Sequence, residues 1–158
     1  MTQPDPEQRL RDLGLTLPEP PEPVAAYIPS VRTGNVVVTA GQIPVRDGVL
    51  IAMGSVPGEV SLEDAVECAR QCALNGLAVV KREAGSLDRI RRVVRLGCFV
   101  QAESGFGAHP QVANGASELM LELFGDRGRH ARAAVGASGL PLNAPVEIEF
   151  TFEIEPDV

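Results

Sequence analysis

The stretch that decides the fold is Val146-Glu-Ile-Glu-Phe-Thr-Phe-Glu-Ile-Glu155, near the end of the chain. Apolar and polar residues alternate through it without a break. Because successive side chains of a β-strand point to opposite faces, this period of two predicts a strand with one buried face and one polar face. Four glutamates share the polar face, so we expect water or a cationic group to lie against them.

A shorter β-like run precedes this strand. It covers Ala133 to Ala137 and is entered from Arg132, and Gly139, Pro141 and Asn143 supply turn chemistry between the two runs. We expect the runs to pair as antiparallel neighbours. The side chains of Arg132 and an early glutamate would then lie together at the edge of the sheet. The functional prediction depends on this contact.

The length of 158 residues predicts one domain with a substantial core. Residues 1–23 are acidic and proline-rich and are interpreted as an extension, with a short helix capped by Asp5 followed by a stiff connector. The body is then 24–158. No apolar run approaches the ~18 residues that span a bilayer, and no apolar signal-peptide segment opens the chain. We therefore expect no membrane partner and a cytoplasmic location.

The formal net charge of −7 disfavours a nucleic-acid partner, because phosphate neutralisation supplies most non-specific affinity. The three cysteines are predicted to be free, buried thiols in a reducing compartment. Cys68 and Cys72 have no second pair, and His109 and His130 have no companion ligands, so no metal site is predicted.

The remaining pattern gives an α+β architecture. Strands are predicted over 27–31, 36–40 and 90–100, with a hairpin at Asp47-Gly48. One helix follows Ser61 and ends at Gly85, and another begins at Pro110 and ends before Gly125. Alternation in 90–100 places Val94, Leu96, Cys98 and Val100 on one face. Two helices would cover one face of a single sheet, and the other face, with Glu147, Glu149 and Arg95, would be wet or buried between subunits.

Four stretches, in this order, resemble the RidA/YjgF family of reactive-imine deaminases, also called the L-PSP endoribonuclease-like family. They are Ala26–Val31, Gly34–Pro44, Ala69–Gln71 with Asn75, and Ala131-Arg132 continuing through Leu140-Pro141 to Val146–Glu149. The N-terminal extension suggests a divergent subgroup. The resemblance implies a chorismate-mutase-like fold with one mixed β-sheet, assembled as a homotrimer with three clefts between subunits.

The resemblance also implies a reaction and roles for single residues. Arg132 would grip the carboxylate of a small 2-imino or enamino acid, which a planar guanidinium does through two parallel hydrogen bonds. Glu147 would hold or activate water, and Tyr27 would line the cleft across the subunit interface. Backbone groups around Gly41 and Ala134 would help to hold the ligand. The products would be a 2-oxo acid and ammonia, without a cofactor.

The sequence departs from the family at two positions. The serine common before the glycine is Ala40, and the cysteine often found two residues after the arginine is Ala134. Asn114 matches a family asparagine with its spacing to the arginine changed by about one residue. The loss of polar side chains supports an alternative, a non-catalytic binder of small carboxylates or a trimeric scaffold. The acidic charge disfavours the endoribonuclease activity in the family's other name.

Each site residue also has a purely structural interpretation. Arg132 would form a surface ion pair with Glu147 or Asp126, an arrangement worth little energy. Glu147 would be one of several solvated glutamates, and Tyr27 an ordinary half-buried strand tyrosine. These alternatives make different predictions about which side chains lie together.

Overall fold

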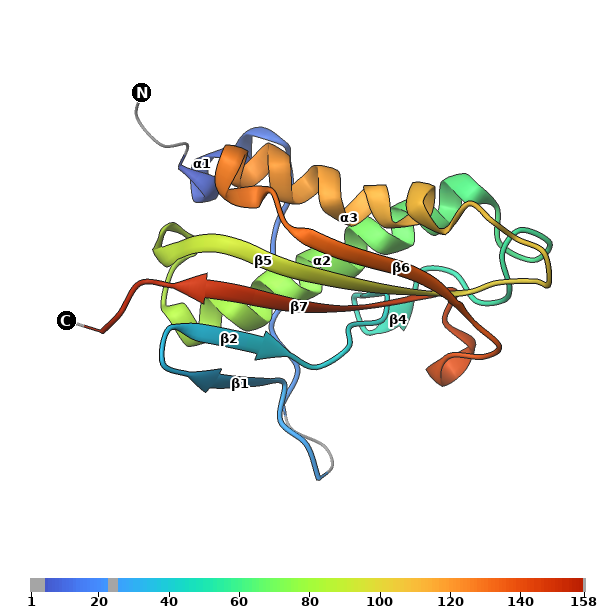
Figure 1. The fold of residues 1–158 in the computed structure, drawn as a ribbon, viewed down its shortest axis with the longest axis horizontal. Helices are drawn as coiled ribbons and strands as arrows, with labels where there is room; N and C mark the ends of the chain where they lie inside the picture. The colour runs from blue at the N-terminus through green and yellow to red at the C-terminus, as the bar shows by residue number, and fades with distance from the viewer. Residues whose placement is uncertain (1–4, 23–25, 158) are drawn as a thin grey trace.

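The computed structural model describes residues 5–22 and 26–157. Its strands and helices, in chain order, are α1 (Pro6–Asp12), β1 (Ser30–Thr33), β2 (Val36–Thr39), β3 (Val45–Arg46), β4 (Val49–Leu50), α2 (Leu62–Ala84), β5 (Ile90–Gln101), α3 (His109–Phe124), β6 (Ala131–Ala137) and β7 (Val146–Ile154), with short 3-10 turns at Leu87–Arg89, Gly125–Gly128 and Pro141–Asn143. The long helices α2 and α3 lie on one face of the sheet, and α1 packs beside α3 (Figure 1). This confirms the α+β class with two helices on one face of one sheet.

The main sheet has the order β1-β2-β7-β5-β6, in which β5 and β6 are parallel and the other neighbours antiparallel. Strand β7 is central, and its residues alternate strictly between buried and half-buried, as its sequence predicts. The predicted antiparallel pairing of the two C-terminal runs is wrong, because β5 lies between β6 and β7. Strands β5 and β2 offer larger apolar side chains beside β7 than the alanine-rich β6 would. The connection through α3 then brings β6 to the other edge of β5, parallel to it.

The register of the sheet separates two residues that the sequence was expected to bring together. Leu96 of β5 pairs with Arg132 on one side and with Phe150 on the other, and Leu96 and Phe150 are buried under the helices. Phe99 pairs with Val135 and with Glu147. Because paired residues share a face and alternate residues do not, Arg132 faces the helix side and Glu147 the open side of the sheet.

The predicted helix ends are confirmed. The Ser61 side chain accepts a hydrogen bond from the Asp64 N–H at 3.1 Å, and Gly85 ends α2 with φ of 88°. Helix α2 lies close to the sheet at Gly76, where an added Cβ would sit 2.6 Å from the Phe150 ring. A small residue there lets the helix axis approach the central strand.

Two local expectations are wrong. A bulge between Val93 and Arg95 turns Val93 inward, while Val94 is 39 % exposed. Strand β1 begins at Ser30, so Tyr27 lies outside it and is 61 % exposed. Pro29 separates the two, and a proline has no N–H to donate to a strand ladder.

The N-terminal extension docks on the body through polar and apolar contacts. Asp5 caps α1, and Leu10 is buried. Glu7 accepts hydrogen bonds from the Leu87 N–H and the Lys81 ammonium, both at 3.1 Å, and Arg9 donates to the Glu122 carbonyl. Within the part of the chain that is described, no helix is long and apolar enough to cross a membrane.

The three cysteines are free and buried, as predicted. Burial raises the pKa of Cys68 and of Cys98 to about 12, and it raises the pKa of Cys72 as well. All three thiols therefore stay protonated near neutral pH, which is unsuited to a nucleophile.

Candidate functional site

The guanidinium of Arg132 is held at the edge strand β6 by two side chains of α3. Its Nη1 donates to Asn114 Oδ1 at 2.8 Å and to Ser117 Oγ at 3.1 Å. Among the residues described, Nε and Nη2 have no hydrogen-bond partner and the guanidinium has no carboxylate. One edge of the planar fork is thus fixed by α3, and Arg132 also lines a surface hollow of about 240 Å³.

A third residue supports this arrangement. His130 Nδ1 lies 2.6 Å from the carbonyl oxygen of Gly128, and its Nε2 lies 3.0 Å from Ser117 Oγ. Because a carbonyl only accepts, Nδ1 carries the proton, and in the neutral ring Nε2 accepts from the serine hydroxyl. The Ser117 hydroxyl then donates to His130 and accepts from Arg132, so its orientation is fixed at both ends. We call Arg132, Asn114, Ser117 and His130 the arginine cluster.

The Glu147 carboxylate lies on the other face of the sheet, against Gly41. A Cβ added at Gly41 would meet Glu147 Oε1 at 2.1 Å, so only a glycine leaves room for this side chain. Gly41 is held next to β7 because Gln42 and Ile148 exchange two backbone hydrogen bonds of 2.8 and 2.9 Å. In the described chain, the Gly41 N–H has no acceptor and the Glu147 carboxylate no cationic partner. We call Gly41 and Glu147, with Ala40 and Tyr27 beside them, the glutamate cluster.

The protonation of Glu147 is altered by its surroundings. Partial burial, and next the negative charge of Glu149, raise the pKa of the Glu147 carboxyl above its usual range. Glu149 itself is paired with Arg95 at 3.2 Å. Glu147 is therefore the carboxyl on this face best suited to exchange a proton with a substrate or water.

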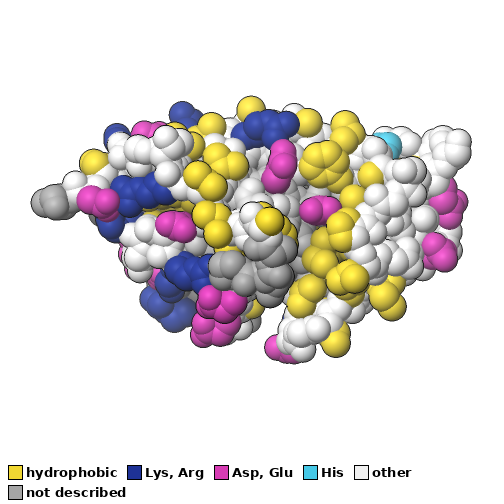
Figure 2. Space-filling model, turned by 90° about the horizontal axis from the view of Figure 1, so that it is seen from below, with side chains coloured by type: hydrophobic (Ala, Val, Ile, Leu, Met, Phe, Trp, Pro, Cys, Tyr) yellow, Lys and Arg dark blue, Asp and Glu magenta, His cyan; other side chains and the backbone are white. Residues whose placement is uncertain are grey.

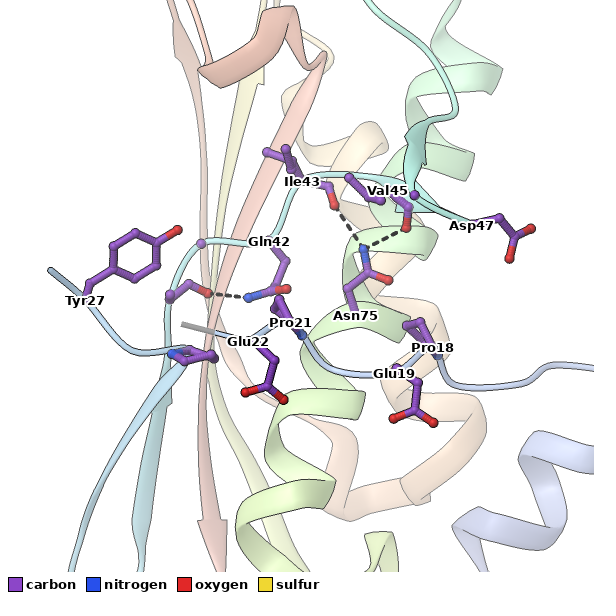
Figure 3. A pocket seen from close by; sticks show the side chains of 14 residues that line it. Pro18, Glu19, Pro21, Glu22, Tyr27, Gln42, Ile43, Val45, Asp47 and Asn75 are labelled. Carbon is purple, nitrogen blue, oxygen red and sulfur yellow. Dashed lines mark hydrogen bonds between the residues drawn. The ribbon is translucent and has the colours of Figure 1, made fainter. Parts of the chain in front are cut away.

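A cavity of about 520 Å³ adjoins the glutamate cluster. Tyr27, Ala40 and Gly41 line one end, and Asn75 of α2 lines the other, with the 40–44 segment between them (Figure 3). The proline-rich connector supplies a further wall through Pro18, Glu19, Pro21 and Glu22. The extension is thus part of the cavity.

Buried amides hold the floor of this cavity. Asn75 Nδ2 donates to the carbonyl oxygens of Ile43 and Val45 at 3.0 and 3.1 Å, and Asn75 Oδ1 accepts from Gln71 at 2.9 Å (Figure 3). Gln42 Nε2 donates to the Ala40 carbonyl at 3.0 Å. These side-chain hydrogen bonds, together with the backbone bridge between Gln42 and Ile148, fix the irregular 40–45 backbone.

The structure therefore divides the predicted site residues into two groups. It brings Arg132 to Asn114, and it brings Tyr27, Ala40 and Gly41 to one cavity with Glu147 adjoining. It does not bring Arg132 to Glu147 within one chain, and Asp126 pairs with Arg129 instead. The ion-pair interpretation of Arg132 is wrong for both carboxylates. Ala134 is half-buried and packs against the hydrophobic core.

Four contributors to the site were not assigned a role from the sequence: Ser117, His130, Gln42 and Asn75. A signal existed for Asn75, since Gln71 and Asn75 lie four residues apart on the apolar stripe of α2, and a buried amide pair needs partners. No local pattern joins Ser117 to His130, which lie in different elements.

The open face of the sheet carries apolar side chains beside its charges. Val31, Val38 and Val135 are 56, 44 and 46 % exposed, and Phe99 is half-buried on the same face. Figure 2, which views the molecule from the side of β1, shows apolar side chains gathered in its centre and right half, Lys and Arg towards the left and top, and carboxylates in both halves. Apolar rows on a sheet face are suited to contact another chain.

Comparison with known proteins accounts for most of the chain. Residues 7–153 match the family described as "YjgF/chorismate_mutase-like, putative endoribonuclease". Protein TCP17 of Trypanosoma cruzi is 37 % identical over 146 residues, 92 % of this chain and 91 % of that protein. A 2-iminobutanoate/2-iminopropanoate deaminase of Dermatophagoides farinae is 30 % identical, with 89 % and 95 % covered.

A solved structure shares the fold over most of its length. The protein Atu1372 of Agrobacterium tumefaciens, whose function is unknown, superposes with a TM-score of 0.87 at 42 % sequence identity, and 94 % of this chain and 91 % of that chain are covered. The family match over residues 7–153 reaches from α1 into β7. The protein therefore belongs to the RidA/YjgF family, with its chorismate-mutase-like fold.

Proposed function

We propose that the protein hydrolyses reactive 2-imino and enamino acids to 2-oxo acids and ammonia, in clefts formed between copies of the chain in a homotrimer. The proposal rests above all on the hydrogen bonding of the Arg132 guanidinium. Its Nη1 is anchored by Asn114 and Ser117, while Nε and Nη2 have no partner among the described residues. A fork fixed on one side and unpaired on the other is suited to receive a carboxylate.

The glutamate cluster supplies the complementary half. A substrate held by its carboxylate presents the neighbouring C=N carbon to water, and Glu147 takes a proton from that water as it attacks. The balance is R–C(=NH2⁺)–COO⁻ plus H2O giving R–CO–COO⁻ plus NH4⁺. The free Gly41 N–H offers a hydrogen bond to the substrate, and it remains available although Ala40 has no side-chain hydroxyl.

The two halves require a second chain. Within one chain Arg132 and Glu147 lie on opposite faces of the sheet and on strands separated by β5. Within the described ranges neither charge has a counter-charge, and the two are of opposite sign. The partly apolar open face offers a surface on which another copy can pack. A homotrimer that places β6 of one chain beside the 40–42 segment of the next would complete three equivalent sites.

The relatives support the reaction without fixing it, since one is named as a 2-iminobutanoate/2-iminopropanoate deaminase. The test is to generate the imine of alanine in situ with an amino-acid oxidase and catalase, and to trap unreacted imine with semicarbazide. Added protein should speed 2-oxo acid release and reduce the trapped imine, compared with the same protein after heat denaturation. Binding of pyruvate in the cleft with no change in imine lifetime would instead favour a non-catalytic binder of small carboxylates.

A further inference from the structure

The cavity between the connector and α2 has an unusual lining. Its apolar part comes from Pro18, Pro21, Ile43 and Val45, and its volume of about 520 Å³ is that of a small-molecule pocket. Tyr27 and Gly41 line one end of it, and Gly41 lies against the Glu147 carboxylate, which is outside the lining. The cavity reaches from there to Asn75 of α2 (Figure 3). It is therefore placed to receive the side chain of a substrate whose carboxylate and imine lie at the glutamate cluster.

The charges in the lining are of one sign. Glu19, Glu22 and Asp47 line the cavity, and no Lys or Arg is among the described residues that do. Glu22 is paired with Arg82 at 3.4 Å. Glu19 and Asp47 have no cationic or hydrogen-bonding partner in the described ranges, so two carboxylates at the rim are left without a counter-charge.

The side chain of Gln42 is a second, independent polar feature of the lining. Gln42 is only 7 % exposed, yet its side chain lines the cavity. Its Nε2 donates to the Ala40 carbonyl, whereas Oε1 has no partner within the described chain and is directed towards the space between Pro21 and Asn75 (Figure 3). An amide oxygen that reaches the cavity and has no partner among the described residues can accept a hydrogen bond from a ligand that brings a donor.

We propose that this cavity, walled by the N-terminal extension, binds a long substrate side chain ending in a cation, so that the enzyme prefers 2-imino acids derived from basic amino acids. The inference rests on the proposed function and names its substrate class. The apolar walls would contact the methylene stem, Gln42 Oε1 would accept a hydrogen bond, and Glu19 and Asp47 would face the cationic end.

The test uses a matched pair of substrates. The imines derived from arginine and from citrulline have nearly the same size, but only the first carries a charge. We expect kcat/KM to be roughly three- to tenfold higher for the arginine-derived imine, since each partly exposed charge pair contributes modestly. The double variant Glu19→Gln/Asp47→Asn should bring the ratio close to one. Glu63→Gln, an exposed glutamate at the start of α2, should retain the wild-type ratio.

The outcomes separate this inference from the proposed function. Equal rates for the two imines in the wild type, or an unchanged ratio in the double variant, would overturn the cationic pocket while leaving the hydrolase intact. If no imine is hydrolysed faster, the proposed function fails. The cationic pocket is then tested by calorimetry with the 2-oxo acids that correspond to arginine and citrulline. Tighter binding of the guanidinium compound by wild type than by the double variant would support the pocket. Equal binding by the two proteins would refute it.

Discussion

The arginine cluster and the glutamate cluster differ in how they are built. The arginine cluster lies on an exposed edge strand, and side chains of α3 and the following loop hold its charge in place through hydrogen bonds of 2.6 to 3.1 Å. The glutamate cluster lies on the open face, and close backbone approach at Gly41 positions its charge. One cluster fixes a cation by polar contacts, and the other leaves a carboxylate half-buried with a raised pKa.

This difference suggests that the clusters have separate tasks. A fixed guanidinium is suited to binding, because its geometry does not have to change during a reaction. A carboxylate that binds a proton more readily than usual is suited to proton transfer. Substitutions in the two clusters should therefore have different kinetic effects.

Removal of the guanidinium should have the largest effect. Arg132→Ala is expected to lower kcat/KM for the alanine-derived imine by roughly 100-fold or more, because two charge-assisted hydrogen bonds to the substrate carboxylate are lost. Arg11→Ala is the matched control, since Arg11 is exposed on α1 and its guanidinium donates to Gln8 of the same helix. Equal steady-state rates for Arg132→Ala and wild type would remove the clamp from the account.

Loss of the carboxylate should come next. Glu147→Gln is expected to lower kcat by about 10- to 100-fold with a smaller change in KM, because it removes proton transfer and keeps the shape of the side chain. A loss seen only in KM would show that Glu147 binds substrate and takes no part in proton transfer.

The raised pKa of Glu147 gives this prediction a pH dependence. The carboxylate form accepts the proton, so kcat/KM should fall as pH drops through the raised pKa, above the ordinary value of 4.5. Glu149→Gln removes one cause of the raised pKa and should move this acid limb to lower pH. Because burial is the larger cause, the limb should stay above the ordinary value.

The same shift has a consequence for stability. A carboxyl whose pKa is higher in the folded than in the unfolded state destabilises the fold as pH rises through the window between the two values. Glu147→Gln should therefore have a higher Tm than wild type at pH 7, and the difference should vanish below about pH 4, where both states are protonated. A lower Tm for the variant at pH 7 would contradict the assignment.

A backbone change tests the glutamate cluster without touching a charge. Gly41→Ala should displace the Glu147 carboxylate, whose Oε1 would lie 2.1 Å from the new Cβ, and lower kcat about tenfold while the fold persists. Gly139→Ala is the matched control, since nothing lies within 4 Å of a Cβ there. Similar kinetics for the two variants would show that the close approach at Gly41 has no functional role.

The smallest effect is expected when a side chain that holds the Arg132 guanidinium is changed. Ser117→Ala should raise KM about three- to tenfold with little change in kcat, because Arg132 loses one of its two anchors. Ser117→Thr keeps the hydroxyl and should remain near wild type. A fall in kcat with unchanged KM for Ser117→Ala would move Ser117 from substrate binding to the chemical step.

Much of the fold follows from local patterns in the sequence. The alternation of Val146–Ile154 predicts the central strand, Ser61 and Gly85 predict the ends of α2, and Asp47-Gly48 predicts the β3–β4 turn, where both residues have positive φ. These features depend on neighbouring residues, so the chain itself encodes them.

Features that depend on distant pairing were not predictable in the same way. The alanine-rich β6 carries no information about its neighbour in the sheet, and the bulge before Arg95 reverses the faces of Val93 and Val94. The proline-rich connector has no periodicity, so nothing local placed Glu19 at a cavity wall. The separation of Arg132 from Glu147 follows from these long-range pairings.

The central claim is that each site takes its arginine from one chain and its glutamate from another, and subunit complementation tests it directly. The Arg132→Ala and Glu147→Gln proteins are each expected to keep at most about a tenth of wild-type activity. They would be mixed in equal amounts, unfolded and refolded together. In random trimers about one quarter of the sites would combine an intact arginine with an intact glutamate, so about one quarter of wild-type activity should return. If the mixture stays as inactive as its components although mixed trimers form, both residues must act within one chain and the account is wrong.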